Sequence, residues 1–169
     1  MLIISKKRPL RGVFFISLHC QSQKNPSRDM INVRGDCVIF IQLFIITFFV
    51  FFLIDLLWLG IIAKNLYNKF LGHLLKDNVN WIAAIVFYLI FIVGLVFFVL
   101  MPAVEQDSFW FAFLVGGLFG FITYATYDLT NLATLKSWPI KITLIDLGWG
   151  MSLGAFTSLI SYTIYTLIF

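Results

Sequence analysis

The chain has 169 residues, of which 61% are hydrophobic and only 12% are charged, and its mean hydropathy is +0.97. A soluble domain is usually about a quarter charged, and a soluble core could not hide this much apolar surface. The basic residues behind the net charge of +4 stand at the ends of apolar runs, not along a stripe with exposed aromatics, which argues against nucleic acid as a partner. The lipid bilayer is the expected surroundings.

Residues 1–36 are polar and basic, unlike the rest of the chain. Their seven basic side chains are Lys6, Lys7, Arg8, Arg11, Lys24, Arg28 and Arg34. Two interpretations stay open. Either the segment is an extension, poorly ordered or a short helix, that lies on an anionic membrane surface, or the reading frame starts too early and translation begins at Met30.

Four later stretches are long enough to cross a bilayer, which takes about 20 apolar residues per helix. They cover roughly residues 37–63, 81–101, 109–130 and 142–169. The alternation of apolar and polar residues that marks a membrane barrel is absent, and Asn80 stands where it can cap the second helix. The sequence therefore predicts an all-α fold, with residues 37–169 forming one integral membrane four-helix bundle.

The loops between these helices differ in charge. The first and third loops hold Lys64, Lys69, Lys76, Lys136 and Lys141, whereas the second holds Glu105 and Asp107. Because cytoplasmic loops carry the excess of Lys and Arg, the loops favour a topology with loops one and three inside and both termini outside. The basic residues of the N-terminal segment compete with this assignment.

Three aspartates, Asp55, Asp128 and Asp146, interrupt the first, third and fourth apolar helices. An Asp at the centre of a membrane helix costs about 2.5 to 3.5 kcal/mol, so all three should face the bundle interior. In a four-span topology all three lie toward the same side, roughly 7 to 14 Å from a basic loop at 1.5 Å per residue. We expect a shared polar cluster in one leaflet.

Helical spacing suggests how the third and fourth helices meet. One stripe of the third helix holds Gly116, Gly120, Tyr124, Tyr127 and Asn131, with Asp128 at its edge. Gly150 and Gly154 lie on the face of the fourth helix that carries Asp146. Small residues spaced four apart let membrane helices approach closely, so these glycines predict a packed pair.

The four-residue pattern Asp-x-x-Trp occurs twice, as Asp55 with Trp58 and as Asp146 with Trp149. Duplicated halves are common in transporters, but the repeat is too short to establish a duplication. A structural interpretation is equally open, in which the aspartates bond to Tyr, Asn, Thr or Trp and fix helix register.

The sequence predicts no metal and no cofactor. Cys20 and Cys37 match neither a zinc spacing nor a disulfide framework. His73 lies on the side of the carboxylates, but a solvated loop histidine is the favoured interpretation. No known catalytic signature is present, which favours a protein that is not an enzyme.

Five segments resemble a known family: residues 55–60 (Asp-Leu-Leu-Trp-Leu-Gly), 80–84, 124–136, 138–139 and 146–150 (Asp-Leu-Gly-Trp-Gly). Together they resemble the bacterial domain-of-unknown-function family 2177, over roughly residue 39 to the C-terminus. The resemblance implies a multi-pass protein of the bacterial inner membrane. It implies no catalytic or binding residues.

Three functions remain as hypotheses. The first is a binding or transport module, in which the aspartates, Tyr124, Tyr127 and Asn131 bind or conduct a proton, cation or small solute, with a homo-oligomer as a corollary. The second is a membrane enzyme acting on a lipid or other apolar substrate, with an Asp as general base and Lys64 or Lys136 holding a head group, although both lysines could instead snorkel to the interface. The third is a structural or assembly subunit, with every Asp hydrogen-bonded and no cavity.

Overall fold

The computed structural model describes residues 26–72, 74 and 78–169, with side chains from residue 35 onward. The basic residues before Pro26, together with His73 and Lys76, lie outside the described residues. The described part is helical, without a strand, and four of its helical segments are long and apolar enough to cross a membrane. The predicted all-α four-helix fold is confirmed.

The first membrane-spanning segment is one continuous helical stretch made of α1 (Pro26–Leu57), the π-helical η1 (Trp58–Ala63) and α2 (Lys64–Leu71). It continues eight residues beyond the predicted end of the span, because no glycine or proline follows Ala63 until Gly72, and Lys and Leu are good helix formers. Lys64 and Lys69 therefore lie on a helix, whereas the sequence analysis placed them in a loop.

The second segment consists of α3 (Trp81–Leu95), the π-helical η2 (Val96–Leu100) and α4 (Met101–Glu105). The side chain of Asn80 caps it by accepting a hydrogen bond of 3.2 Å from the backbone N–H of Ala83. This satisfies one of the backbone donors that the first turn of a helix leaves free.

The third and fourth segments are α5 (Phe109–Thr134) and α6 (Ile140–Ile168). Ser108 caps α5 through a hydrogen bond of 3.2 Å from the Phe111 N–H, and Pro139 precedes the first residue of α6. The two helices form the most extensive helix pair of the bundle.

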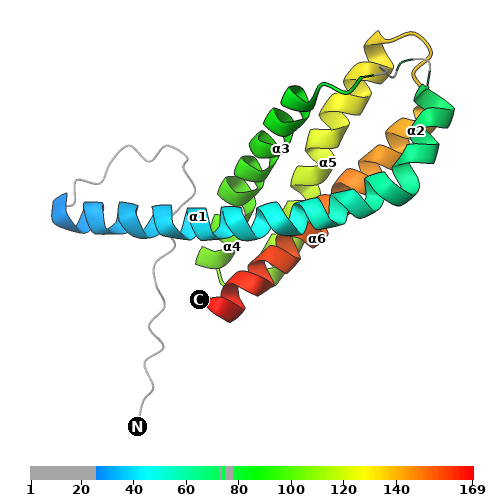
Figure 1. Cartoon of the computed structure of the whole chain (residues 1–169). Helices are drawn as coiled ribbons and strands as arrows, with labels where there is room; N and C mark the ends of the chain where they lie inside the picture. Colours follow the sequence, from blue (N-terminus) through cyan, green and yellow to red (C-terminus); the bar gives the residue numbers. More distant parts are fainter. Residues whose placement is uncertain (1–25, 73, 75–77) are drawn as a thin grey trace.

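Figure 1 shows α3, α5 and α6 running alongside one another while α1 crosses them at a wide angle and then bends through η1 into α2. The end of α2, the start of α3, the end of α5 and the start of α6 lie together at one end of the molecule. The connection between α4 and α5 and the C-terminus lie at the opposite end.

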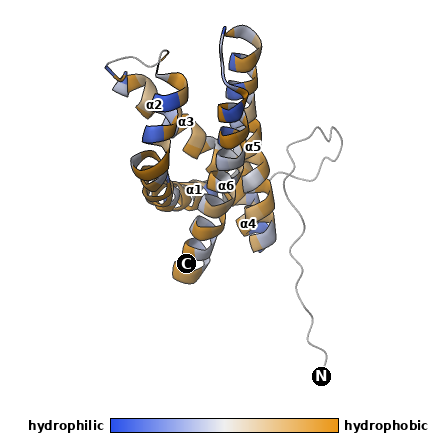
Figure 2. Ribbon diagram, turned by 90° about the vertical axis from the view of Figure 1, so that its right-hand side faces the viewer, coloured by the Kyte–Doolittle hydropathy of each residue, from blue (hydrophilic) through white to orange (hydrophobic). Residues whose placement is uncertain are grey.

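The outer surface of the bundle is apolar. Large hydrophobic side chains such as Leu53, Ile82 and Leu144 are exposed, while Phe51 and Leu153 are among those that fill the core. Figure 2 shows that hydrophilic residues gather near α2 and at the neighbouring ends of α5 and α6. An exterior of this kind is matched to lipid along most of its length, and the polar end is where the three aspartates lie.

Candidate functional site

The glycines of α5 and α6 meet back to back and fix how the two helices lie. A Cβ atom added to Gly116 would lie 2.7 Å from the Gly154 carbonyl oxygen, and one added to Gly120 would lie 2.9 Å from the Gly150 carbonyl carbon. Since nothing larger than a hydrogen fits, the two backbones touch. This contact sets the register that places Asp128 and Asp146 on the same side of the bundle.

All three aspartates are buried: Asp55 and Asp146 are 5% exposed and Asp128 is fully buried. Two of them have tyrosine partners. The Tyr88 hydroxyl on α3 donates to Asp55 Oδ2 over 2.9 Å, and the Tyr67 hydroxyl on α2 donates to Asp146 Oδ1 over 2.8 Å. Each of these bonds joins two different helices across the bundle.

Asp128 differs from the other two. Neither of its carboxylate oxygens has a hydrogen-bond partner among the described residues, although both are buried. An unpartnered charge is among the least favourable groups that a membrane interior can hold. Asp128 therefore lacks the compensation that its two counterparts have.

Asp128 lines a pocket of about 480 Å³ together with Asp146. The pocket is walled by side chains of α2, α3, α5 and α6. Its lining residues are Tyr67, Phe87, Thr123, Tyr124, Thr126, Tyr127, Asp128 and Asp146. Two carboxylates and no basic side chain belong to this lining, so the pocket has an acidic character inside largely aromatic walls.

The two Asp-x-x-Trp segments meet face to face. The rings of Trp58 and Trp149 stack with centroids 4.3 Å apart and planes 7° from parallel. Because each Trp follows its Asp by about one helical turn, the stack joins the turn of α1 that carries Asp55 to the turn of α6 that carries Asp146. The two copies of the Asp-x-x-Trp pattern therefore contact each other, and this contact joins the first and fourth spans.

Tyr124 lies near both carboxylate–tyrosine pairs. It lies within electrostatic reach of both Asp55 and Asp146, and a Cβ added to Gly150 would run into its ring. Gly150 therefore makes room for the ring that forms one wall of the pocket.

The sequence-predicted residues separate into two groups. Asp128, Asp146, Tyr124 and Tyr127 line the pocket. The remaining four do not line it: Asp55, which bonds to Tyr88, the half-buried Asn131, and the exposed Lys64 and Lys136.

The three carboxylates also do not form one ligand set. Among residues 26–72, 74 and 78–169, no three His, Cys, Asp or Glu side chains gather closely enough to hold a metal ion. Asp128 and Asp146 share the pocket, whereas Asp55 lies outside its lining and bonds to Tyr88.

Sequence reasoning missed Tyr67 and Tyr88, the two hydrogen-bond donors. The hydropathy of the sequence falls after Ala63, which predicts that the span ends there. The helix instead continues to Leu71 and carries Tyr67. Tyr88 lies within a uniformly apolar span. The sequence feature that indicates its role is the hydroxyl itself, because a tyrosine hydroxyl buried in a membrane needs a hydrogen-bond partner.

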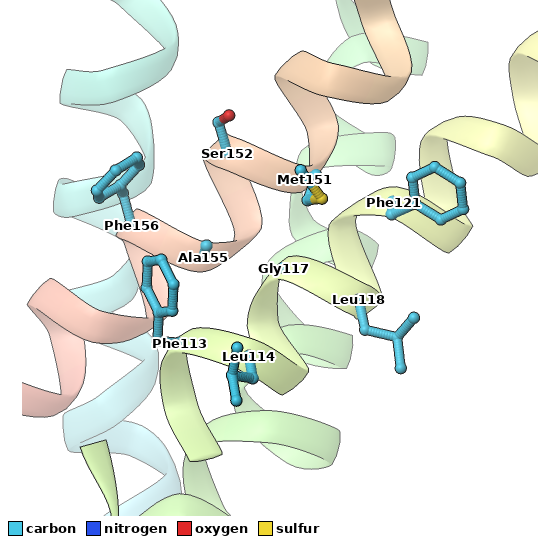
Figure 3. Close-up of a pocket in the computed structure, with 9 residues that line it drawn as sticks. All are labelled: Phe113, Leu114, Gly117, Leu118, Phe121, Met151, Ser152, Ala155 and Phe156. Atoms are coloured by element: carbon cyan, nitrogen blue, oxygen red, sulfur yellow. The ribbon is translucent and has the colours of Figure 1, made fainter. Parts of the chain in front are cut away.

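A second hollow lies on the outer face of α5 and α6 and differs from the first in the chemistry of its lining. The volume of this groove is about 440 Å³. Figure 3 shows Phe113, Leu114, Met151 and Phe156 among its lining side chains. Its lining contains no charged residue. An apolar groove on an apolar membrane face is matched to lipid chains and offers no chemistry of its own.

Comparison with known proteins gives one match. Neither the curated proteins nor the solved structures include a match to the chain. The family model described as a predicted membrane protein, DUF2177, matches residues 40–163. These residues cover the second and third membrane-spanning segments completely, most of the first and fourth, and all three buried aspartates described above. The chain belongs to the DUF2177 family of predicted membrane proteins.

Proposed function

We propose that the protein is a binding module of the bacterial inner membrane that takes a small solute carrying positive charge or hydrogen-bond donors into the pocket of Asp128 and Asp146. In a transport role, four spans would act as a homo-oligomer, because a full alternating-access pathway usually needs more helices than one chain supplies. In this proposal loops one and three face the cytoplasm, and both termini lie on the opposite side of the membrane. A reporter that is active only outside the cytoplasm, fused to Phe169, should therefore be active. An inactive but expressed fusion would reverse the topology.

One observation supports this function over a purely structural one. A structural subunit needs every buried carboxylate to be hydrogen-bonded, which holds for Asp55 and Asp146. Asp128 is fully buried, has no partner among the described residues, and lines a pocket large enough for a ligand. Natural proteins retain such groups mainly where they serve a ligand, an ion or a proton.

The pocket also has the composition of a small-molecule site. Such sites are mostly apolar or aromatic and contain a few polar groups that fix the orientation of the ligand. Here the lining residues with polar groups are Asp128, Asp146, two threonines of α5, Thr123 and Thr126, and three tyrosines. Both threonine hydroxyls already donate their protons to backbone carbonyls of their own helix, and the carboxylates are the strongest acceptors that the lining offers to an occupant.

The test is the thermal unfolding of purified protein in neutral detergent, measured across pH and with added inorganic cations and amines. Wild type should gain several degrees with at least one of these, because a ligand that binds only the folded state stabilises it. Asp128→Asn keeps the size of the side chain but removes its charge and should lose the response. If Asp128→Asn remains folded and responds as wild type does, the proposal is wrong.

Asp107→Asn is the matched control. Asp107 lies at the opposite end of the bundle, accepts a hydrogen bond of 3.0 Å from Tyr162 and has a φ of 48°. Asn keeps an acceptor oxygen and tolerates positive φ, so this variant should respond to ligand as wild type does.

A further inference from the structure

We propose that the occupant of this pocket is an organic ammonium ion on an apolar chain, and that it reaches the pocket sideways from the lipid. This inference rests on the proposed function and adds the chemical class of the ligand. The chemistry is shared by a membrane lipid with an amine head group and by a free amphiphilic amine.

The walls favour an organic cation. Four aromatic rings line the pocket: those of Tyr67, Phe87, Tyr124 and Tyr127. Aromatic faces attract ammonium groups, most strongly when water is excluded. Since the Tyr67 hydroxyl already donates to Asp146, its ring is the part that remains for an occupant. Aromatic rings around acidic groups are the usual surroundings of a bound alkylammonium.

The acidic groups are too few for a bare metal ion. A calcium ion takes six to eight oxygen ligands, and magnesium requires a nearly regular octahedron. The described residues hold no group of three metal-ligating side chains, and the pocket contributes two carboxylates within about 480 Å³. That volume is many times the roughly 30 Å³ of one water molecule. An ammonium ion with carbon substituents can pair with the carboxylates and also fill the volume of the pocket.

The unpartnered carboxylate identifies which group the ammonium meets. Asp128 is fully buried and both of its oxygens are free of hydrogen bonds among the described residues. Asp146 already accepts from Tyr67 through one oxygen. An ammonium N–H supplies to Asp128 the hydrogen bond that the other two aspartates receive from tyrosines.

Exposed side chains on the pocket wall mark the route from the membrane. Tyr127 is 61% exposed and Phe87 is 48% exposed, although both belong to membrane-spanning segments. Surfaces exposed at that depth face lipid chains. A ligand passing between them can leave its tail among the lipids while its nitrogen reaches Asp128. The pocket lies roughly 7 to 14 Å below the basic end, at 1.5 Å per residue, which suits a short head group on a chain.

The experiment measures the unfolding midpoint of the full chain in lipid-free neutral detergent with decylamine, decanol and decanoate, which share a tail and differ in charge. Decylamine should raise the midpoint of wild type and Asp107→Asn by several degrees and leave Asp128→Asn unchanged. Decanol and decanoate should have no such effect. An equal response to decanol and decylamine would mean that the pocket recognises only the tail, which overturns the inference.

Tyr127→Leu is the second variant, useful if Asp128→Asn fails to fold. Because Tyr127 is largely exposed, its replacement should not disturb folding, yet it removes one ring of the cage. Decylamine affinity should fall about three- to tenfold, the usual effect of one cation–aromatic contact. Unchanged affinity would contradict the aromatic part of the inference.

Two further measurements distinguish a lipid from a free amine as the ligand, and failure of this inference from failure of the proposed function. Nanodiscs with phosphatidylethanolamine, compared with phosphatidylglycerol, show whether a lipid head group occupies the site and competes with decylamine. Without competition, a free amine is the ligand. If sodium or protons alone give a response that depends on Asp128, the proposed function stands and this inference fails. If no probe stabilises the wild type, both fail.

Discussion

The contact between α5 and α6 has two halves: one is closely packed through glycines, and the other opens into a pocket with acidic side chains. In one half, Gly116 and Gly120 meet Gly150 and Gly154 with no room for a methyl group. In the other half, beyond Gly120 and before Gly150, Asp128 and Asp146 share a pocket of about 480 Å³. The tight half fixes the geometry of the helix pair, while the open half has both space and a buried carboxyl group without a partner among the described residues.

The largest effect is expected in the tight half. Gly120→Ala should lower the free energy of unfolding by about 3 kcal/mol, the upper end for overpacking, because the added methyl meets backbone atoms of α6 that cannot rotate away. Gly148→Ala is the control: nothing lies within 4 Å of a Cβ there, so a small gain from helix propensity is expected. Thermal unfolding in detergent compares the two, and equal effects would show that the glycine contact is not tight.

The next largest effect concerns the carboxylate outside the pocket. Tyr88→Phe removes the hydroxyl that donates to Asp55 and should destabilise the protein by about 1.5 kcal/mol, near the upper limit measured for hydrogen bonds in membrane proteins. It should leave ligand response intact, because neither residue lines the pocket. Loss of binding with unchanged stability would place Asp55 in the functional site.

Tyr67→Phe tests the corresponding bond inside the pocket and should cost about 1 kcal/mol. Here the ligand response should change as well, because the variant frees a second carboxylate next to Asp128. Chemical unfolding measures the loss of stability, and a decylamine titration measures the change in ligand response. A variant that changes neither would show that the Tyr67–Asp146 bond is not formed.

The smallest effect is expected for the tryptophan stack. Trp58→Phe should cost about 0.5 kcal/mol, the low end for an aromatic pair, because a smaller ring still covers Trp149. Trp81→Phe serves as the control, since Trp81 is 71% exposed. Tryptophan fluorescence of the two variants would also differ, and identical unfolding curves would contradict a stabilising stack.

The fold could be predicted because four long apolar segments admit few arrangements in a bilayer. The glycine spacing further indicated which helices lie together. The site was harder to predict. Burial of Asp128 follows from its position in an apolar helix, but its lack of a partner depends on where Tyr67 and Tyr88 point. Those two tyrosines bond to Asp146 and Asp55 across 79 and 33 residues of sequence, and helical spacing within one segment gives no information on such contacts.

The most direct test of the central claim compares the stability of two variants without ligand. Asp55→Asn should unfold at a lower temperature than wild type, because it weakens the acceptor that Tyr88 bonds to. Asp128→Asn should unfold at the same or a higher temperature, because it replaces a buried ionisable group that no described residue hydrogen-bonds. If Asp128→Asn loses as much stability as Asp55→Asn, Asp128 is a structural group and the account of the pocket as a functional site is wrong.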